Sequence, residues 1–405
     1  MRGHPYGEAA RPPDRPRTGR PRGADAALRR PKGYPSAHGG TVTGIRVVRA
    51  RGDGLARGMQ IGKELTDLIQ SSIDFYHRYL GRRGVSSEQL QDLLTPYLMA
   101  AETVYPESMA VLKGMSIGAL VPVLELFAIN AFEELEPLLE SPEGELLFLQ
   151  KKEGYTKDPG PAPEHCSSLS VRTPTTTLLA HNEHWLAGDM NNVAVIIDIP
   201  ADGRVAIASP TVVCCLPAVG LNAHGLAQGI GSLTASDDRV GAPRVLVSRS
   251  SLEGRDKADA VTRAALPTRA GGYGHVFALP QDAFVVETSG GQHRVLDGPG
   301  PHTNHYQSDL AELAPPASAG STARLARLKA LIAERNPQTP DELMEIMRDH
   351  ESSPQAICLH PDPTEGDEAS ACLFSMVTDV GAKRLWVAQG NPCQNAYEEI
   401  DLSGL

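Results

Sequence analysis

The feature that most constrains the fold is a change of pattern at Cys166. Before it, across residues 41–145, apolar side chains recur at the three- and four-residue spacing of helices. After it, they come in short runs of strand length separated by turn residues. Two of these turns, Ala201–Gly203 and Asn222–Gly225, have the composition of hairpin turns. Antiparallel strands with helices gathered apart from them predict an α+β layered fold and argue against a parallel doubly wound one.

The first part of the chain is expected to be mostly helical after one opening strand near Ile45–Val48. The expected helices are Met59–Ile73, Ser87–Glu102, Pro106–Ala119 and Val121–Leu139. Gly58 and Gly62 lie four residues apart in the first helix. Their spacing indicates that another backbone packs closely there, because a glycine presents no side chain.

The second part is expected to alternate strands with a few helices. The strands are expected at Leu178–Ala180, Val193–Ile199, Val205–Ser209, Thr211–Leu216, Leu226–Leu233, His275–Leu279, Ala283–Thr288, Leu373–Asp379 and Leu385–Gln389. The helices are expected at Lys257–Ala265, Ser321–Ala333 and Pro340–Arg348. Thr339 has the side chain of an N-cap for the last of these helices.

Composition excludes several classes of function. A net charge of −11 argues against a nucleic-acid binder, whose surface is usually basic. No apolar run approaches the roughly 18 residues of a membrane span. The six cysteines show no CxxC spacing, which favours neither a zinc ribbon nor a disulfide scaffold and fits a reducing, cytoplasmic setting. Cys214 and Cys215 lie in an apolar run and are expected in the core.

Residues 1–40 differ from the rest of the chain. They are rich in Arg, Pro and Gly, and basic against an acidic body. A nucleic-acid or membrane arm is one interpretation. We favour a disordered tail, or translation from an upstream start, because the segment has no apolar face to offset the entropy of ordering. Residues 41–405 are then expected to form a single domain.

The setting of Cys166 suggests a chemical role. A polar, proline-rich segment, residues 158–165, leads directly to this cysteine at the first position of a buried strand. Enzymes that cut their own chain to free a nucleophile have this layout. A freed Cys166 would carry a thiol and an α-amine whose pKa is about 7.7–8.0, so the amine can serve as the base for the thiol. The alternative is a small buried hydrophobe.

Six short motifs in order carry a family resemblance. They are Cys166–Leu169, His181–Trp185, Val219–Ala227, Thr303–Tyr306, Ser321–Arg327 and Gly390–Cys393. Together they resemble the acyl-coenzyme A:6-aminopenicillanic acid acyltransferase family, a cysteine branch of the N-terminal nucleophile hydrolases. The resemblance extends over roughly residues 41–401, including the helical region 55–139.

The resemblance implies a four-layer αββα sandwich of two antiparallel sheets between helical layers. It implies that the precursor cleaves itself before Cys166 into an α part, 41–165, and a β part, 166–405. The family hydrolyses amides or moves acyl groups between amines and thioesters, which suggests a role in specialised metabolism. The expected partners are a small-molecule amide or acyl donor and the two chains of one precursor, with a homo-oligomer allowed. Neither a cofactor nor a metal is expected.

Carried over position by position, the resemblance implies two sets of site residues. The catalytic set is Cys166, Asn182, His184 and Gly231. The substrate-binding set is Trp185, Asn304, His305, Ser321 and Arg324, with Arg324 suited to a substrate carboxylate.

Three positions depart from the family pattern. His184 stands where the family has an Asp that supports the nucleophile, and Glu183 beside it could supply the missing charge. However, adjacent strand residues face opposite sides. Gly231 stands where the family has an oxyanion-hole Asn, so backbone amides, Asn222 or Ser232 would have to compensate. His165 precedes the cleavage point, where small residues are usual.

Other interpretations stay open at this stage. His181 and His184 could bind a metal with Cys166 or His165. Asn304 and His305 could simply close a turn, and Arg324 and Arg327 could be solvated helix charges. An uncleaved Cys–His amidase or protease could use His305 or His184 as its base. A degenerate family member could bind a ligand without turnover.

Overall fold

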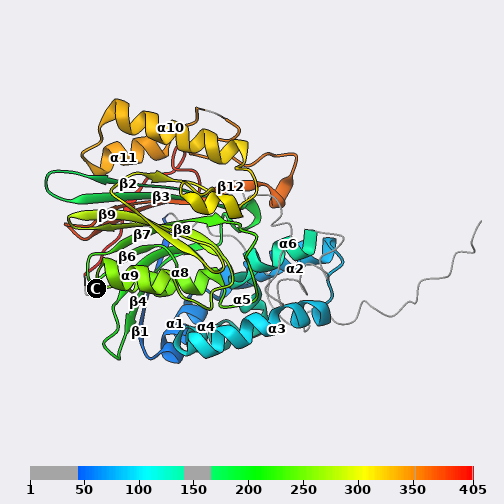
Figure 1. The fold of residues 1–405 in the computed structure, drawn as a ribbon. Coiled ribbons are helices and arrows are strands. Elements are labelled where there is room, and N and C mark those ends of the chain that lie inside the picture. Colours follow the sequence, from blue (N-terminus) through cyan, green and yellow to red (C-terminus); the bar gives the residue numbers. More distant parts are fainter. Residues whose placement is uncertain (1–43, 141–165, 352, 404) are drawn as a thin grey trace, which may run out of the picture. The chain divides into compact units, whose positions relative to one another are not determined.

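Two β-sheets stacked face to face form the centre of the described chain (Figure 1). The computed structural model describes residues 44–140, 166–351, 353–403 and 405. The expected tail, the segment 158–165 and the peptide bond before Cys166 lie outside these residues. Among the described helices, none is long and apolar enough to cross a membrane.

The larger sheet has eight strands in the order β1-β4-β5-β6-β7-β8-β9-β10. Its strands are β1 (Arg46–Gly52), β4 (Val193–Pro200), β5 (Ile207–Val212), β6 (Gly220–Asn222), β7 (Ala227–Leu233), β8 (Gly272–Leu279), β9 (Asp282–Thr288) and β10 (His293–Asp297). β1 pairs with β4 in parallel, and the other neighbours are antiparallel. The strand from before Cys166 is therefore paired with one from after it.

The smaller sheet has six strands in the order β11-β2-β3-β12-β13-β14, all antiparallel. Its strands are β2 (Ser167–Arg172), β3 (Thr177–Leu186), β11 (Pro301–His302), β12 (Ser370–Asp379), β13 (Arg384–Gln389) and β14 (Glu398–Glu399). Cys166 immediately precedes β2, so it lies at the end of a strand inside this sheet.

Helices cover the outer face of each sheet (Figure 1). α10 (Ala319–Arg335) and α11 (Pro340–Met347) pack on the smaller sheet. The larger sheet is covered by α1 (Gly54–Glu64), α2 (Thr66–Arg82), α3 (Ser87–Val104), α4 (Pro106–Ala119), α5 (Val123–Asn130), α6 (Phe132–Glu140), α8 (Arg244–Leu252) and α9 (Lys257–Ala264). This is the α+β, four-layer αββα arrangement that the sequence predicted.

Apolar residues alternate between the layers along each inner strand. On β4, Val195 and Ile197 face the core between the sheets, whereas Ala194 and Ile196 face the helices. A strand buried on both faces needs apolar residues at every position, which explains the continuous run seen in the sequence. Burying both faces fixes the position of β2 and β3, and with them the position of Cys166.

The close backbone approach predicted at Gly58 and Gly62 is confirmed. A Cβ on Gly58 would lie 2.0 Å from the Val111 carbonyl oxygen, and one on Gly62 would lie 2.3 Å from that of Met115. The facing helix α4 supplies Gly114, where a Cβ would lie 2.2 Å from the Leu55 carbonyl oxygen. Helices α1 and α4 thus touch backbone to backbone.

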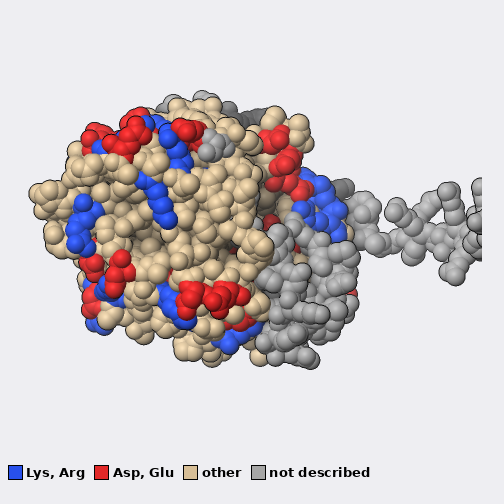
Figure 2. Space-filling model, turned by 45° about the horizontal axis from the view of Figure 1, so that its top comes forward, with Lys and Arg blue, Asp and Glu red and all other residues tan. Residues whose placement is uncertain are grey.

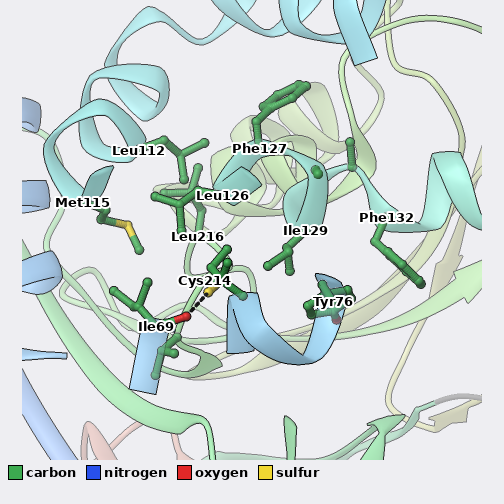
Figure 3. Close-up of a cluster of buried hydrophobic side chains, with 14 of the residues drawn as sticks. Ile69, Tyr76, Leu112, Met115, Leu126, Phe127, Ile129, Phe132, Cys214 and Leu216 are labelled. Carbon is green, nitrogen blue, oxygen red and sulfur yellow. Dashed lines mark hydrogen bonds between the residues drawn. The ribbon is translucent and has the colours of Figure 1, made fainter. Parts of the chain in front are cut away.

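Cys214 is confirmed as a core residue, whereas Cys215 is only partly buried. Figure 3 shows Cys214 among side chains from several helices, with its thiol directed at the Ile69 carbonyl oxygen 3.7 Å away. The apolar neighbours include Leu126, Ile129 and Leu216. This cluster joins the helical part before Cys166 to the sheet that follows it.

Some element predictions were wrong in detail. The expected first helix is two helices that meet at Leu65, and the expected strands at Val205–Ser209 and Thr211–Leu216 are the single strand β5 followed by a turn. Helix α8 and strand β10 were not predicted. The capping box at Thr339 is confirmed.

Charged side chains lie beside partners of opposite sign on the face shown in Figure 2. Among the described residues, Arg82 pairs with Asp367 and Glu368, and Arg83 also pairs with Glu368. The expectation that the chain binds no nucleic acid stays a prediction.

Candidate active site

Cys166 lies at the start of β2 with its side chain buried, 2% exposed. Its Sγ donates a hydrogen bond to Glu183 Oε1 on the neighbouring strand β3, 3.2 Å away. β2 and β3 are antiparallel with Ser168 opposite His181, so the cysteine is held beside the middle of β3. The register of two buried strands therefore fixes the contact between thiol and carboxylate.

A chain of polar contacts continues from Glu183. Its Oε2 accepts from His181 Nε2 at 2.9 Å, and His181 Nδ1 lies 2.9 Å from Ser168 Oγ. Ser168 Oγ in turn lies 3.2 Å from the carbonyl oxygen of Ile230 on β7. The contacts connect the thiol to both sheets and fix the orientation of the carboxylate that accepts its proton.

The pKa of the Cys166 thiol is raised well above its ordinary value. Burial is the largest cause and the negative charge of Glu183 is the second, because both disfavour a thiolate. The thiol of the uncut chain is therefore protonated at neutral pH. Its reaction as a nucleophile requires a group that takes the proton, and Glu183 is placed to do so.

Asn182 and His184 point away from Cys166. Asn182 Nδ2 donates to the carbonyl oxygens of Met347 and Ile357, and His184 Nε2 also bonds to that of Ile357, at 3.0 Å. Alternation along β3 puts these side chains on the face covered by α11, while His181 and Glu183 face the other sheet. The structure does not bring the side chains of Asn182 and His184 to the thiol, and the nearby carboxylate is that of Glu183.

Arg324 on α10 holds the backbone of the cysteine. Its Nη1 donates to the Cys166 carbonyl oxygen at 2.7 Å and to Ser167 Oγ at 2.9 Å, while its Nη2 donates to Asn304 Oδ1 at 3.1 Å. The side chain is buried, 2% exposed. The guanidinium is therefore engaged by the chain itself, whereas the sequence suggested a substrate carboxylate as its partner.

Ser321 ties the Thr303–Tyr306 loop to α10. Its Oγ accepts from the Asn304 backbone N–H at 2.8 Å and lies 2.7 Å from His305 Nδ1. The pKa of His305 is lowered by its partial burial and by neighbouring positive charges, so the imidazole is neutral at neutral pH. Two motifs that lie apart in the sequence thus meet beside Cys166.

Gly231 gives room to the backbone of Thr303, next to the side chain of Asn304. A Cβ at Gly231 would lie 2.7 Å from the Thr303 carbonyl oxygen and 3.6 Å from Asn304 Nδ2. Nδ2 also lies 3.4 Å from the Ser232 carbonyl oxygen. The side-chain amide of Asn304 thus lies next to position 231, whereas that of Asn222 bonds to the carbonyl oxygens of Leu252 and Gly254.

A pocket of about 320 Å³ opens beside this loop. Asn304 and His305 line one side of it, together with Leu233 at the end of β7. The remaining lining residues are Thr234, Tyr306, Ala311, Ala314, Pro315, Pro316 and Ala317. The lining is mainly apolar, and Asn304 within it accepts a hydrogen bond from Arg324, which also binds the Cys166 carbonyl oxygen.

A sequence model of the acyl-coenzyme A:6-aminopenicillanic acid acyl-transferase family matches residues 171–394, more than half of the 405 residues. The chain belongs to this family. The match includes β3, the Thr303–Tyr306 loop and α10, whereas Cys166 lies just before its first residue. Membership of the acyltransferase family makes the chain an enzyme of the N-terminal nucleophile class that hydrolyses amides or transfers acyl groups.

The chain also shows weaker similarity to solved structures. A penicillin V acylase from Agrobacterium tumefaciens has 13% identity and a TM-score of 0.40, over 59% of this chain and 87% of that chain. A mutant of the conjugated bile acid hydrolase from Clostridium perfringens has 11% identity and a TM-score of 0.32, over 59% of this chain and 93% of that chain. No curated protein matches the chain.

Trp185 packs away from the pocket described above. Its Nε1 donates to Tyr76 OH at 2.7 Å, and its ring meets that of Phe132 edge to face. Trp185 also packs against the apolar cluster between the two sheets, and its expected contact with a substrate stays a prediction.

Ser168 and Glu133 are neighbours of the site that sequence reasoning did not single out. Glu183 was considered there only as a replacement charge, and His181 only as a metal ligand. Glu133 Oε1 accepts from Ser232 Oγ at 2.9 Å and from Tyr273 OH at 3.1 Å. His181 and Glu183 carry a usable signal, because residues two apart on a strand share a face. The signal becomes decisive only once the register of β2 on β3 is known.

Proposed function

We propose that Cys166 is the nucleophile of a self-processing amidohydrolase or acyltransferase that works through a thioester. The observation that carries the proposal is the setting of Cys166 at the start of β2. Its thiol donates to the Glu183 carboxylate, and its carbonyl oxygen is held by Arg324. A carboxylate within hydrogen-bond reach of the thiol supports this role, because a nucleophilic thiol needs a neighbouring base.

In the processing step, the Cys166 sulfur attacks the carbonyl carbon of the preceding peptide bond as Glu183 takes the thiol proton. The carbon–nitrogen bond breaks, and its nitrogen leaves as the α-amine of Cys166, which receives that proton. Water then hydrolyses the resulting thioester and restores the thiol. The buried Glu183 contact supports this role, because a protonated thiol needs a nearby base.

In the turnover step, the freed α-amine takes the thiol proton, since its pKa lies near about 7.7–8.0. The sulfur attacks the acyl carbon of a substrate amide, and the amine leaves with the proton. Water or a second amine then attacks the thioester, which gives hydrolysis or acyl transfer. Thiol and base lie on one residue, so this step needs no histidine.

We further propose that Asn304 supplies a side-chain donor for the oxyanion. Arg324 Nη2 binds its Oδ1, which directs Nδ2 away from the guanidinium and towards Gly231. Removing one such donor typically lowers the rate by about 10²–10³-fold. The mainly apolar pocket beside Asn304 supports an acyl group of small, apolar character as the part of the substrate that binds there.

The test is the intact mass of the purified protein together with amidase activity. We expect fragments ending and starting at residues 165 and 166. Cys166→Ala should abolish both cleavage and turnover, and Cys166→Ser should cleave slowly and turn over poorly, because a hydroxyl ionises far less than a thiol. Glu183→Gln should slow cleavage. Cys214→Ser, a cysteine of the core cluster in Figure 3, should behave like the wild type.

Other results would point elsewhere. Cleavage between 165 and 166 in Cys166→Ala would contradict self-processing. A full-length protein with thiol-dependent amidase activity would favour an uncleaved enzyme that uses His181, which has a ring nitrogen within 4.8 Å of the thiol. A full-length protein without activity would favour a ligand-binding member of the family.

A further inference from the structure

Two histidines and two cysteines converge on the far side of the smaller sheet from Cys166. Within the part of the chain that the structure describes, the donor atoms of His350, Cys358, His360 and Cys393 all lie within 4.8 Å of one another. His360 Nε2 lies 3.0 Å from His350 Nε2, 3.2 Å from Cys393 Sγ and 3.9 Å from Cys358 Sγ. None of these residues takes part in the proposed reaction.

Hydrogen bonds alone do not account for the three close neighbours of His360 Nε2. One imidazole nitrogen carries either a single proton or a single lone pair, so it can satisfy one of these three neighbours. Four donors on a tetrahedral zinc ion, with bonds of about 2.0–2.3 Å, lie about 3.3–3.8 Å apart. The separations around His360 Nε2 bracket that range.

We propose that His350, Cys358, His360 and Cys393 form a structural zinc site. Two thiolates and two imidazoles in a tetrahedral set favour zinc over magnesium or calcium, which prefer oxygen ligands. All four positions are taken by side chains, which is typical of a structural site and not of a catalytic one. His350 and Cys393 are exposed, so an ion can reach the site from solvent.

Asn391 contacts one of the two cysteines, Cys358, and the backbone beside it. Asn391 Nδ2 lies 3.5 Å from Cys358 Sγ and donates to the Leu359 carbonyl oxygen at 2.7 Å. Donors to a ligand sulfur stabilise its thiolate form and fix its direction. The same asparagine therefore holds both a ligand and the backbone next to it.

A zinc ion bound here would connect the loop after α11 with the loop after β13. His350, Cys358 and His360 belong to the first loop and Cys393 to the second. The Ile357 carbonyl oxygen, next to Cys358, is the acceptor for Asn182 and His184 of β3. Zinc bound here would thus stiffen the outer support of the strand that carries His181 and Glu183 on its inner face.

The test is the metal content of the full-length protein, purified under reducing conditions with added zinc and then desalted without chelator. We expect about one zinc ion per chain. Cys358→Ser and His360→Ala should lose it, whereas the matched controls Cys215→Ser and His224→Ala should keep it. Chelator should lower the Tm of the wild type and leave that of Cys358→Ser unchanged.

Cobalt titration tests the site without relying on a variant that folds. The chelated wild-type protein should bind cobalt(II) with the visible spectrum of a tetrahedral site and a thiolate charge-transfer band, which zinc abolishes. Zinc that is lost on desalting, cobalt bound without a thiolate band, or a Cys358–Cys393 disulfide in the reduced preparation would each overturn the proposal.

Discussion

At the scale of single residues, the two faces of β3 make different contacts. His181 and Glu183 face Cys166 from one side, and Asn182 and His184 hold the Ile357 carbonyl from the other. The family position occupied here by His184 therefore serves the support of the strand in this chain. The negative charge beside the thiol comes from the residue one position earlier.

Replacing Arg324 by lysine tests whether this residue positions the site or binds substrate. A lysine cannot reproduce the fork that reaches Cys166, Ser167 and Asn304. We expect kcat to fall by about 10²-fold with little change in KM, because small displacements at a reacting centre lower the rate strongly. Arg327→Lys, three residues later on α10, is the control. A raised KM with unchanged kcat would indicate that Arg324 binds the substrate.

Glu133 is expected to make the stability of the folded protein depend on pH. Burial, together with the charges of Glu134 and Glu183, raises the pKa of Glu133 to about 8 from 4.5, although Arg244 opposes this. The folded chain therefore keeps a proton that the unfolded chain releases, and stability falls as pH rises through that interval. We would measure the free energy of unfolding by denaturant from about pH 5 to 9. Glu133→Gln should make this free energy fall less steeply with pH, by the contribution of about one proton. The exposed Glu102→Gln should keep the wild-type slope.

Some of these residues could be predicted and others could not. Cys166, Asn304, Ser321 and Arg324 belong to motifs, and the structure brings them together as the resemblance implied. His181, Glu183 and Glu133 depend on strand register and on how α6 packs, which short motifs do not encode. The His350–Cys393 cluster joins residues from two loops, and its spacing matches no metal motif.

At the scale of elements, the contact between α1 and α4 depends on the absence of side chains. Gly114→Ala would place a Cβ within 2.2 Å of the Leu55 carbonyl oxygen and force the helices apart. We expect a loss of about 1–3 kcal/mol in the free energy of unfolding. Gly81→Ala on α2 is the matched control, since a Cβ there has no atom within 4 Å. It should stabilise by about 0.5–1 kcal/mol, and equal effects of the two changes would contradict the argument.

Element type was predictable where one face is buried and apolar, as in α3 and α4, and where both faces are, as in β4. The missed elements have weaker patterns for physical reasons. α8 carries Arg244 and Arg249 in buried ion pairs, so charged residues stand where a core pattern would show apolar ones. β10 is an edge strand with exposed residues at alternate positions.

At the scale of the whole molecule, the parts before and after Cys166 interlock. β1 pairs with β4 along seven residues, Arg57 of α1 binds Asp198 of β4, and Glu134 of α6 binds Arg244 of α8. These contacts bury charged and apolar groups between the two parts. A cut before Cys166 would leave all of them in place.

We therefore predict that the processed protein stays a single particle. Gel filtration should give the same elution volume for the two-chain wild type and the uncut Cys166→Ala variant, and the two chains should separate only in denaturant. Separation in ordinary buffer would show that the parallel pairing of β1 with β4 is too weak to hold the particle together.

Because β1 lies before Cys166 and pairs with β4 after it, refolding should differ between the uncut and the cut protein in its dependence on concentration. In the uncut chain, β1 reaches β4 by closing a loop, so the rate of pairing does not depend on protein concentration. After the cut, the same hydrogen bonds join two separate molecules, and recovery after denaturation becomes a second-order encounter that dilution slows. If the chain is cut before Cys166, the uncut protein would complete the larger sheet in a first-order step, whereas a processed protein that has unfolded would have to recover it in a step that depends on concentration.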